Sequence, residues 1–234
     1  NPLLGRGNDL AAVVGMLGSA RVTSIVGAGG LGKTRLAHAV GREVAQRNVY
    51  FVPLAAVGKD EDVAGEVASV IGVAQDKVVA AVGNIPALIV LDNCEHVIAG
   101  AAEVAQALVS VTDDLRILTT SRAPLGLSSE SVYMLGELPL DTAVDLFGQR
   151  ARAARPGVDL PVEIVAEVCG HLDGLPLAIE LAAARVRVMS VGEIAKRLDD
   201  RFALLRGGSR DAPERHQTLH AVVEWSWNLL DAAG

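Results

Sequence analysis

One eight-residue run limits the fold of this chain more than any other feature: Gly27-Ala28-Gly29-Gly30-Leu31-Gly32-Lys33-Thr34. It follows the apolar run VTSIV, which is typical of a β-strand, and it leads into KTRLAHAVGREVA, which is typical of a helix. The run fits G-x-x-x-x-G-K-[ST], in which glycines let the loop curl and point its N–H groups inward. A loop of this kind before a helix N-terminus binds phosphate groups. The sequence therefore predicts an α/β domain built around this strand, loop and helix.

Individual roles follow from the pattern. The loop from Gly27 to Gly32, followed by the start of the helix at Arg35, is predicted to bind a nucleotide. Lys33 would reach the β- and γ-phosphates, and the Thr34 hydroxyl would bind Mg²⁺. The alternative is a glycine-rich turn that matches the pattern by accident. The strand before the motif and the helix after it favour the nucleotide site.

Other segments predict the rest of a parallel sheet. Short apolar runs at 22–27, 87–93 and 115–122 each end where small or polar residues begin, and strands that are apolar on both faces are typical of parallel sheets covered by helices. A further run at 49–55 contains Pro53, which suits a strand end better than its middle. Helical patterns such as 96–110 alternate with these strands, so we expect a doubly wound α/β core.

Asp92 is the predicted partner of the phosphate loop. It follows five apolar or small residues in ALIVLDN, so it would emerge at the carboxyl end of a central strand, where ligands of open α/β sheets bind. There it could hold Mg²⁺ together with Thr34. The alternative is an ordinary strand-end aspartate, which would be preferred in a chain that had no phosphate loop.

The residue that would orient water for hydrolysis is not settled by the sequence. Asn93 stands where many such ATPases have an acid. Glu95, two residues further on, could turn towards the γ-phosphate, or it could be an N-terminal acid that complements the dipole of the helix at 96–110. Either way we expect slow turnover of ATP.

Arg122 ends the strand candidate LRILTTSR, on the same rim as Asp92. An arginine at this position could sense the γ-phosphate, because only a triphosphate extends far enough to pair with it. The alternative is a surface arginine beside the turn that Pro124 indicates. We include Arg122 with Lys33, Asp92 and Glu95 among the predicted catalytic residues.

The pattern changes near residue 136. From Asp141 onward the segments at 141–155, 161–172, 175–189 and 191–200 all have helical periodicity. We therefore expect an α/β core at 1–136, a helical subdomain at 137–205, and a linker with a further element at 206–234. The chain begins and stops abruptly, which suggests a piece of a larger protein.

Composition narrows the function classes. The net charge of −7 argues against direct nucleic-acid binding by this segment. There is no apolar run long enough to span a membrane and no signal-peptide pattern, so the expected compartment is the cytoplasm. Cys94 and Cys169 are far apart and lack a metal-binding pattern, which favours two small core residues.

Four motifs in this order, GAGGLGKT, LIVLDNCEH, ILTTSR and GLPLAIELAAARVR, resemble the STAND class of signalling ATPases. Within that class the chain is most similar to the NB-ARC-like nucleotide-binding module of bacterial transcriptional regulators of the SARP and LuxR types. The resemblance covers almost the whole chain. It implies an adenine nucleotide with Mg²⁺, and flanking DNA-binding and sensor domains in the full-length protein.

The resemblance also implies roles for residues outside the phosphate loop. Gly5-Arg6 matches the N-terminal motif of the family, with Asp9 where glutamate is commoner, so Arg6 would lie near the adenine. Pro176 would contact the base or ribose, although Pro after Gly174 is also a good first-turn helix residue. The segment from Arg215 resembles the start of the winged-helix subdomain of the family.

These observations predict an ATP/ADP-dependent regulatory switch with weak ATPase activity, in which nucleotide-dependent oligomerisation is one expected form of output. Two rivals belong to other classes. A P-loop kinase for a small molecule would need an acceptor pocket and a basic lid, for which Arg150, Arg152 and Arg155 are candidates. A mechanical AAA+ ATPase would need an arginine supplied across a ring.

Overall fold

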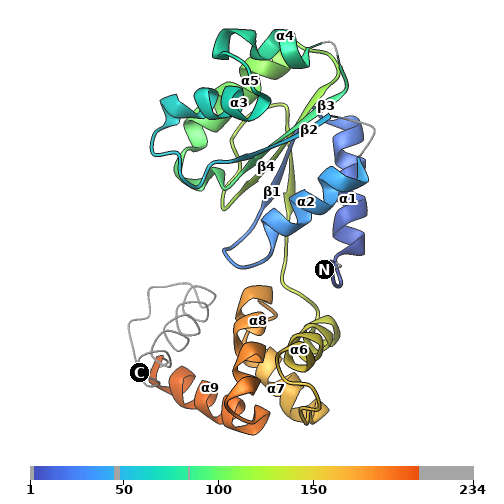
Figure 1. Ribbon diagram of the computed structural model, residues 1–234, viewed down its shortest axis with the longest axis vertical. Helices are drawn as coiled ribbons and strands as arrows, with labels where there is room; N and C mark the ends of the chain where they lie inside the picture. The colour runs from blue at the N-terminus through green and yellow to red at the C-terminus, as the bar shows by residue number, and fades with distance from the viewer. Residues whose placement is uncertain (1–2, 45–47, 84, 206–234) are drawn as a thin grey trace. The chain divides into compact units, whose positions relative to one another are not determined.

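The computed structural model describes residues 3–44, 48–83 and 85–205 (Figure 1). The chain forms two compact units: the first comprises residues 1–135, and the second begins at Gly136. Each unit is described by itself. The predicted linker and winged-helix segment at 206–234 lies outside the described residues.

The first unit is built on a five-stranded sheet with the order β2-β3-β4-β1-β5, in which every neighbouring pair is parallel. The predicted parallel sheet flanked by helices is confirmed. The strands are β1 (Val22–Val26), β2 (Asn48–Pro53), β3 (Ala87–Asp92), β4 (Leu115–Ser121) and β5 (Glu130–Met134).

Of the two edge strands, β2 was predicted from the sequence and β5 was not. Pro53 is the last residue of edge strand β2, as expected from its missing N–H. Strand β5 was not predicted, because its residues are exposed or half-buried and form no continuous apolar run. The three central strands, by contrast, are buried almost throughout.

Helices cover both faces of this sheet (Figure 1). Helices α1 (Gly7–Ser19) and α2 (Lys33–Glu43) pack together on one face. The other face carries α3 (Val63–Ile71), α4 (Val78–Val82) and α5 (Ile98–Ser110), together with the 3₁₀ turns η1 (Asp60–Asp62), η2 (Gln75–Lys77) and η3 (Cys94–His96). The predicted helix at 96–110 is therefore a short 3₁₀ turn followed by a separate helix.

Side-chain alternation along the strands decides which polar groups meet. Ile89 and Leu91 of β3 and Ile117 of β4 belong to the apolar core under α3 and α5. Successive strand residues point to opposite faces, so Asp92 and Thr120 lie on the face that carries α2. This geometry places their side chains beside the N-terminal end of α2.

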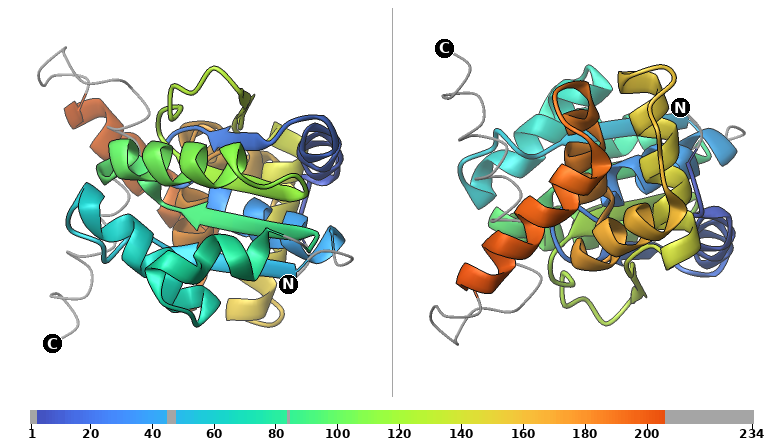
Figure 2. Two further views of the ribbon diagram at one scale, coloured as in Figure 1. Left: turned by 90° about the horizontal axis from the view of Figure 1, so that it is seen from above. Right: turned by 90° about the horizontal axis from the view of Figure 1, so that it is seen from below.

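The second unit is helical, as predicted (Figure 2). It contains α6 (Leu140–Ala154), α7 (Val162–His171), α8 (Pro176–Ala184), the 3₁₀ turn η4 (Arg185–Arg187) and α9 (Val191–Leu205). Its core consists of buried side chains such as Phe147, Val168 and Ile179. Gly174 precedes α8 with a φ of 62°, and a Cβ there would lie 2.4 Å from the Leu138 carbonyl oxygen, so a larger residue would displace the backbone.

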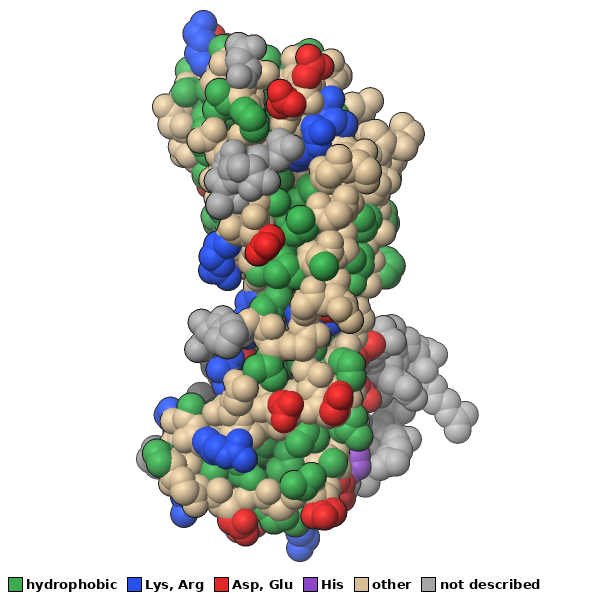
Figure 3. Space-filling view, turned by 90° about the vertical axis from the view of Figure 1, so that its right-hand side faces the viewer, with side chains coloured by type: hydrophobic (Ala, Val, Ile, Leu, Met, Phe, Trp, Pro, Cys, Tyr) green, Lys and Arg blue, Asp and Glu red, His purple; other side chains and the backbone are tan. Residues whose placement is uncertain are grey.

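The charged side chains of the surface are mixed in sign. On the face drawn in Figure 3, acidic and basic side chains are interspersed.

The two cysteines were predicted to be small core residues. Cys94 and Cys169 are buried free thiols, and burial raises the pKa of each to about 12, which suits inert core residues. Across the described ranges, every helix is too short or too polar to cross a bilayer.

Candidate functional site

The phosphate loop joins β1 to α2 and depends on two of its glycines. A Cβ at Gly27 would lie 2.8 Å from the Leu135 carbonyl oxygen and 2.9 Å from Leu31 Cδ1, so the first loop position has room only for hydrogen. Gly32 has a φ of 89° and caps α2 without a side-chain hydrogen bond. The first N–H groups of α2 therefore lack a side-chain cap, which leaves them suited to an anion.

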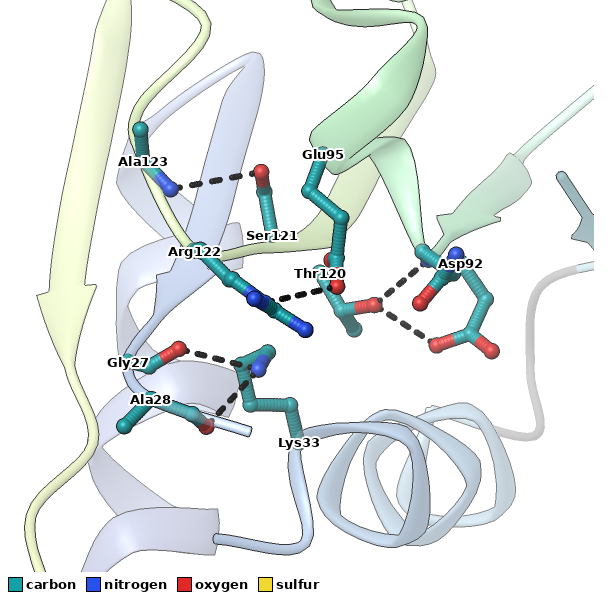
Figure 4. A network of polar contacts seen from close by, with 10 residues as sticks. Gly27, Ala28, Lys33, Asp92, Glu95, Thr120, Ser121, Arg122 and Ala123 are labelled. Carbon is teal, nitrogen blue, oxygen red and sulfur yellow. Dashed lines mark hydrogen bonds and ion pairs between the residues drawn. The ribbon is translucent and has the colours of Figure 1, made fainter. Parts of the chain in front are cut away.

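Lys33 is half-buried and folds back over the loop (Figure 4). Its Nζ donates to the carbonyl oxygens of Gly27, at 2.9 Å, and Ala28, at 3.0 Å. Burial lowers the pKa of Lys33; Glu95 and Asp92 oppose the shift, and Arg122 adds to it. The lysine therefore lies within the electrostatic reach of all the other predicted catalytic groups.

Thr34 and Asp92 meet across the sheet edge, as their predicted shared role requires. Thr34 Oγ1 donates to Asp92 Oδ1 at 2.7 Å, and Thr120 Oγ1 donates to the same oxygen at 2.6 Å. A hydroxyl that gives its hydrogen to a carboxylate keeps its lone pairs for another partner. Thr34 and Asp92 could thus offer adjacent oxygens to a cation.

The chain turns sharply after Asp92. Asn93 has a left-handed φ of 68°, which is uncommon for a residue other than glycine but tolerated by asparagine. In this conformation the Asn93 N–H donates to Thr120 Oγ1 at 2.9 Å. The turn places Glu95 in η3, over the rim of the sheet (Figure 4).

Glu95 pairs with Arg122: the arginine Nε donates to Glu95 Oε1 at 3.1 Å. Helix α5 begins at Ile98, so Glu95 stands before its first turn, which argues against the role of a helix-dipole acid. The other carboxylate oxygen, Oε2, is buried and has no hydrogen-bond partner among the described residues. Arg122 is the more exposed member, with 55% of its side chain accessible against 21% for Glu95.

Arg6 connects helix α1 to the phosphate loop. Its side chain is buried, donating from Nη2 to the Leu31 carbonyl oxygen and from Nη1 to Asp9 Oδ2, each at 3.2 Å. Asp9 also accepts a short hydrogen bond from the Tyr133 hydroxyl. Burial, together with this bond to Asp9, raises the pKa of Tyr133 to about 12. The predicted contact of Arg6 with adenine stays a prediction.

The structure thus gathers Lys33, Thr34, Asp92, Glu95 and Arg122 at the carboxyl edge of the sheet, where β1, β4 and β3 end. Of the other predicted residues, Arg35 is exposed in the first turn of α2, and Pro176 is the first residue of α8 in the second unit. The interpretation of Pro176 as a first-turn helix residue is confirmed. Its contact with a nucleotide stays a prediction.

Sequence reasoning missed Thr120 and Tyr133. Two-residue alternation along ILTTSR separates Thr119 from Thr120 onto opposite faces of the strand, but the register of β3 against β4 decides which of them lies beside Asp92. Tyr133 gave no such signal, because β5 itself was not predicted.

The residues present fit a Mg²⁺–nucleotide complex. Within the described part of the chain, His, Cys, Asp and Glu form no cluster of three or more that could hold a metal ion. Mg²⁺ does not need one, because it is commonly bound by one or two protein oxygens, substrate phosphates and water. Thr34 and Asp92 would hold the ion, and Lys33 with the loop amides would hold the phosphates.

Comparison by sequence finds relatives but no family model that matches. The chain is 40% identical, over 227 residues, to a Mycobacterium bovis protein named "Putative HTH-type transcriptional regulator". The match covers 92% of this chain and 26% of that protein. The chain therefore spans about a quarter of the length of this curated relative.

Comparison by structure finds ATPase folds at low sequence identity. A Walker-type ATPase of Pyrococcus abyssi matches with a TM-score of 0.67 at 17% identity, covering 88% of this chain and 74% of that one. A Signal Transduction ATPase with Numerous Domains (STAND) protein with a tetratricopeptide repeat sensor, from Pyrococcus horikoshii, matches with a TM-score of 0.55 at 17% identity, covering 85% and 32%. The first unit accordingly has the P-loop NTPase fold, and a helical unit follows it in the chain.

Proposed function

We propose that this chain is an ATP/ADP-binding regulatory switch module. The observation that carries the proposal is the convergence of Lys33, Thr34, Asp92 and Arg122 at one sheet edge, beside an uncapped helix N-terminus. These groups are suited to a triphosphate with Mg²⁺. When bound, Mg²⁺ would be held by Thr34 and Asp92 and would neutralise part of the phosphate charge.

The finer proposal is a STAND-class, NB-ARC-like module of a multidomain bacterial transcriptional regulator. Its support is the order of the four sequence motifs, together with a 40% identical relative whose name describes a transcriptional regulator. DNA-binding and sensor domains would flank the module in the full-length protein. Adenine as the base rests on the family resemblance, with Arg6 and Pro176 as its proposed contacts.

Switching needs contacts that differ between ATP and ADP. Arg122 is the proposed source of the difference, because its guanidinium would reach only a γ-phosphate. In the structure that guanidinium is paired with Glu95, so a γ-phosphate would compete with the carboxylate for it. Transfer of Arg122 to the phosphate would free Glu95 to orient water, and we propose that this required exchange keeps hydrolysis slow.

The first experiment identifies any nucleotide that the protein carries. The purified chain is denatured and the released nucleotide is separated by chromatography, with binding of added ATP measured by calorimetry. We expect stoichiometric adenine nucleotide from the wild type and none from Lys33→Ala. The matched control is Lys59→Ala, which removes an exposed lysine on the α3 side of the sheet. A wild-type protein that neither carries nor binds nucleotide would overturn the proposal.

The second experiment tests the switch itself. Arg122→Ala is expected to weaken ATP binding about tenfold or more, the scale of a charge-assisted hydrogen bond, and to leave ADP binding unchanged. Arg42→Ala serves as the control, because it removes an exposed arginine at the opposite end of α2. Equal loss of ATP and ADP affinity would exclude γ-phosphate sensing by Arg122.

A further inference from the structure

We propose that Thr120 is a positioning residue for the Mg²⁺ site. The inference rests on the proposed function, because it concerns the cation that accompanies the nucleotide. Thr120 is not itself a proposed ligand. It would act through Asp92, by holding the carboxylate in the orientation that Mg²⁺ requires.

The first support is the hydrogen bonding of the Thr120 hydroxyl, which acts both as a donor and as an acceptor. It donates its one hydrogen to Asp92 Oδ1 at 2.6 Å, and it accepts the Asn93 N–H at 2.9 Å. The bond from Asn93 therefore fixes the direction in which the hydroxyl can donate. One side chain of β4 thus holds both the carboxylate at the end of β3 and the backbone that follows it.

The second support is burial. Thr120 is 1% exposed and Asp92 is 8% exposed, whereas Thr34 is exposed. A hydrogen bond to a carboxylate is strong, and burial keeps water from competing for the carboxylate oxygen. The oxygen that Thr120 holds is the same one that Thr34 contacts, so the position of Asp92 relative to the proposed cation depends on Thr120.

The neighbouring residue provides an internal comparison. Thr119 is also buried, and its hydroxyl lies 2.6 Å from Ser24 Oγ. Alternation along β4 directs Thr119 to the opposite face from Thr120, away from Asp92. The two adjacent threonines are 0% and 1% exposed and have equally short hydroxyl contacts, but of the two only Thr120 touches a proposed cation ligand.

The test compares Thr120→Val with Thr119→Val, because each change removes one buried hydroxyl and keeps the side-chain shape. ATP affinity is measured by calorimetry in EDTA and over a series of Mg²⁺ concentrations, and thermal unfolding is recorded for each variant. Thr120→Ser restores the hydroxyl. Thr120→Ala is the second variant if the valine protein does not fold.

Mg²⁺ should raise ATP affinity, and we define its midpoint as the Mg²⁺ concentration that gives half of this increase. We expect Thr120→Val to raise the midpoint about 10-fold to 100-fold, the usual effect of losing a residue that hydrogen-bonds to a metal ligand. Its affinity for ATP in EDTA should stay within about twofold of the wild type. Thr119→Val should keep the wild-type Mg²⁺ dependence, and Thr120→Ser should recover it.

Two results would overturn the inference, and they are distinguishable. If the wild type binds ATP with a Mg²⁺ dependence that Thr120→Val and Thr119→Val both retain, the hydroxyl has only a structural role and the proposed function still stands. If the wild type binds no ATP with or without Mg²⁺, the proposed function and this inference fail together.

Discussion

Polar side chains serve different purposes in the two units. In the first unit, charged and hydroxyl groups from the ends of two strands, β3 and β4, and from the start of α2 converge at a single edge of the sheet. In the second unit, polar groups join neighbouring helices or cap a helix end. Arg150 of α6 pairs with Glu180 of α8 at 2.9 Å, and Ser190 and Glu193 cap the start of α9.

The difference lies in what each arrangement leaves available for a ligand. In the helical unit, the Arg150–Glu180 contact is made within the fold, between two helices. At the sheet edge, Lys33 donates to loop carbonyls, and Glu95 keeps a buried oxygen without a partner among the described residues. Substitutions at the edge should therefore change nucleotide binding more than stability, and substitutions in the helical unit should do the reverse.

The largest effect is expected for Asp92→Asn. The amide can still accept from Thr34 and Thr120, so the fold should persist, but the charge that attracts Mg²⁺ is lost. ATP affinity measured with Mg²⁺ should fall on the order of 100-fold, while the thermal midpoint changes little. The control is Asp145→Asn, a change at an exposed acid on α6, which should behave as the wild type. An equal loss in both variants would contradict the assignment.

Two buried glycines should respond with opposite signs. A Cβ added at Gly27 would meet the Leu135 carbonyl and a packed leucine, so Gly27→Ala should destabilise by about 1–3 kcal/mol. At Gly148 the nearest atom is Arg152 Nη1, at 3.1 Å, the end of a flexible side chain. Gly148→Ala in the interior of α6 should therefore stabilise by about 0.5–1 kcal/mol. Denaturant unfolding of both variants gives the signs, and destabilisation at Gly148 would show that Arg152 cannot move.

How far the sequence could predict the molecule also differs between the regions. The motif around Lys33 and the apolar runs that end at Asp92 and Arg122 are local, so they predicted the central strands and the residues at their ends. The pairing of Arg122 with Glu95 depends on how far η3 turns after Asn93, and no local pattern specifies that. The role of Thr120 likewise depends on the register of β3 against β4, which the fold sets.

A smaller effect is expected at the ion pair of the helical unit. Both members of the Arg150–Glu180 pair are partly exposed, so solvent screens their attraction. Glu180→Gln should lower the free energy of unfolding by at most about 1 kcal/mol and leave ATP affinity unchanged. Glu167→Gln, at an exposed acid on α7, is the control. A loss of ATP affinity in Glu180→Gln would mean that the helical unit supports the nucleotide site directly.

The smallest effect concerns the start of α9, where Glu193 accepts hydrogen bonds from Ser190 N and Oγ at 2.8 and 2.9 Å. These bonds hold the pKa of Glu193 below its ordinary value of 4.5. A carboxylate with a lowered pKa stabilises the folded state fully above the unfolded pKa, and the benefit is lost as the pH falls through the folded pKa. Glu193→Gln cannot titrate, so the thermal midpoint of the wild type should fall slightly more than that of the variant between about pH 5 and pH 3. Parallel curves would show that the charge of Glu193 adds nothing to stability at this helix start.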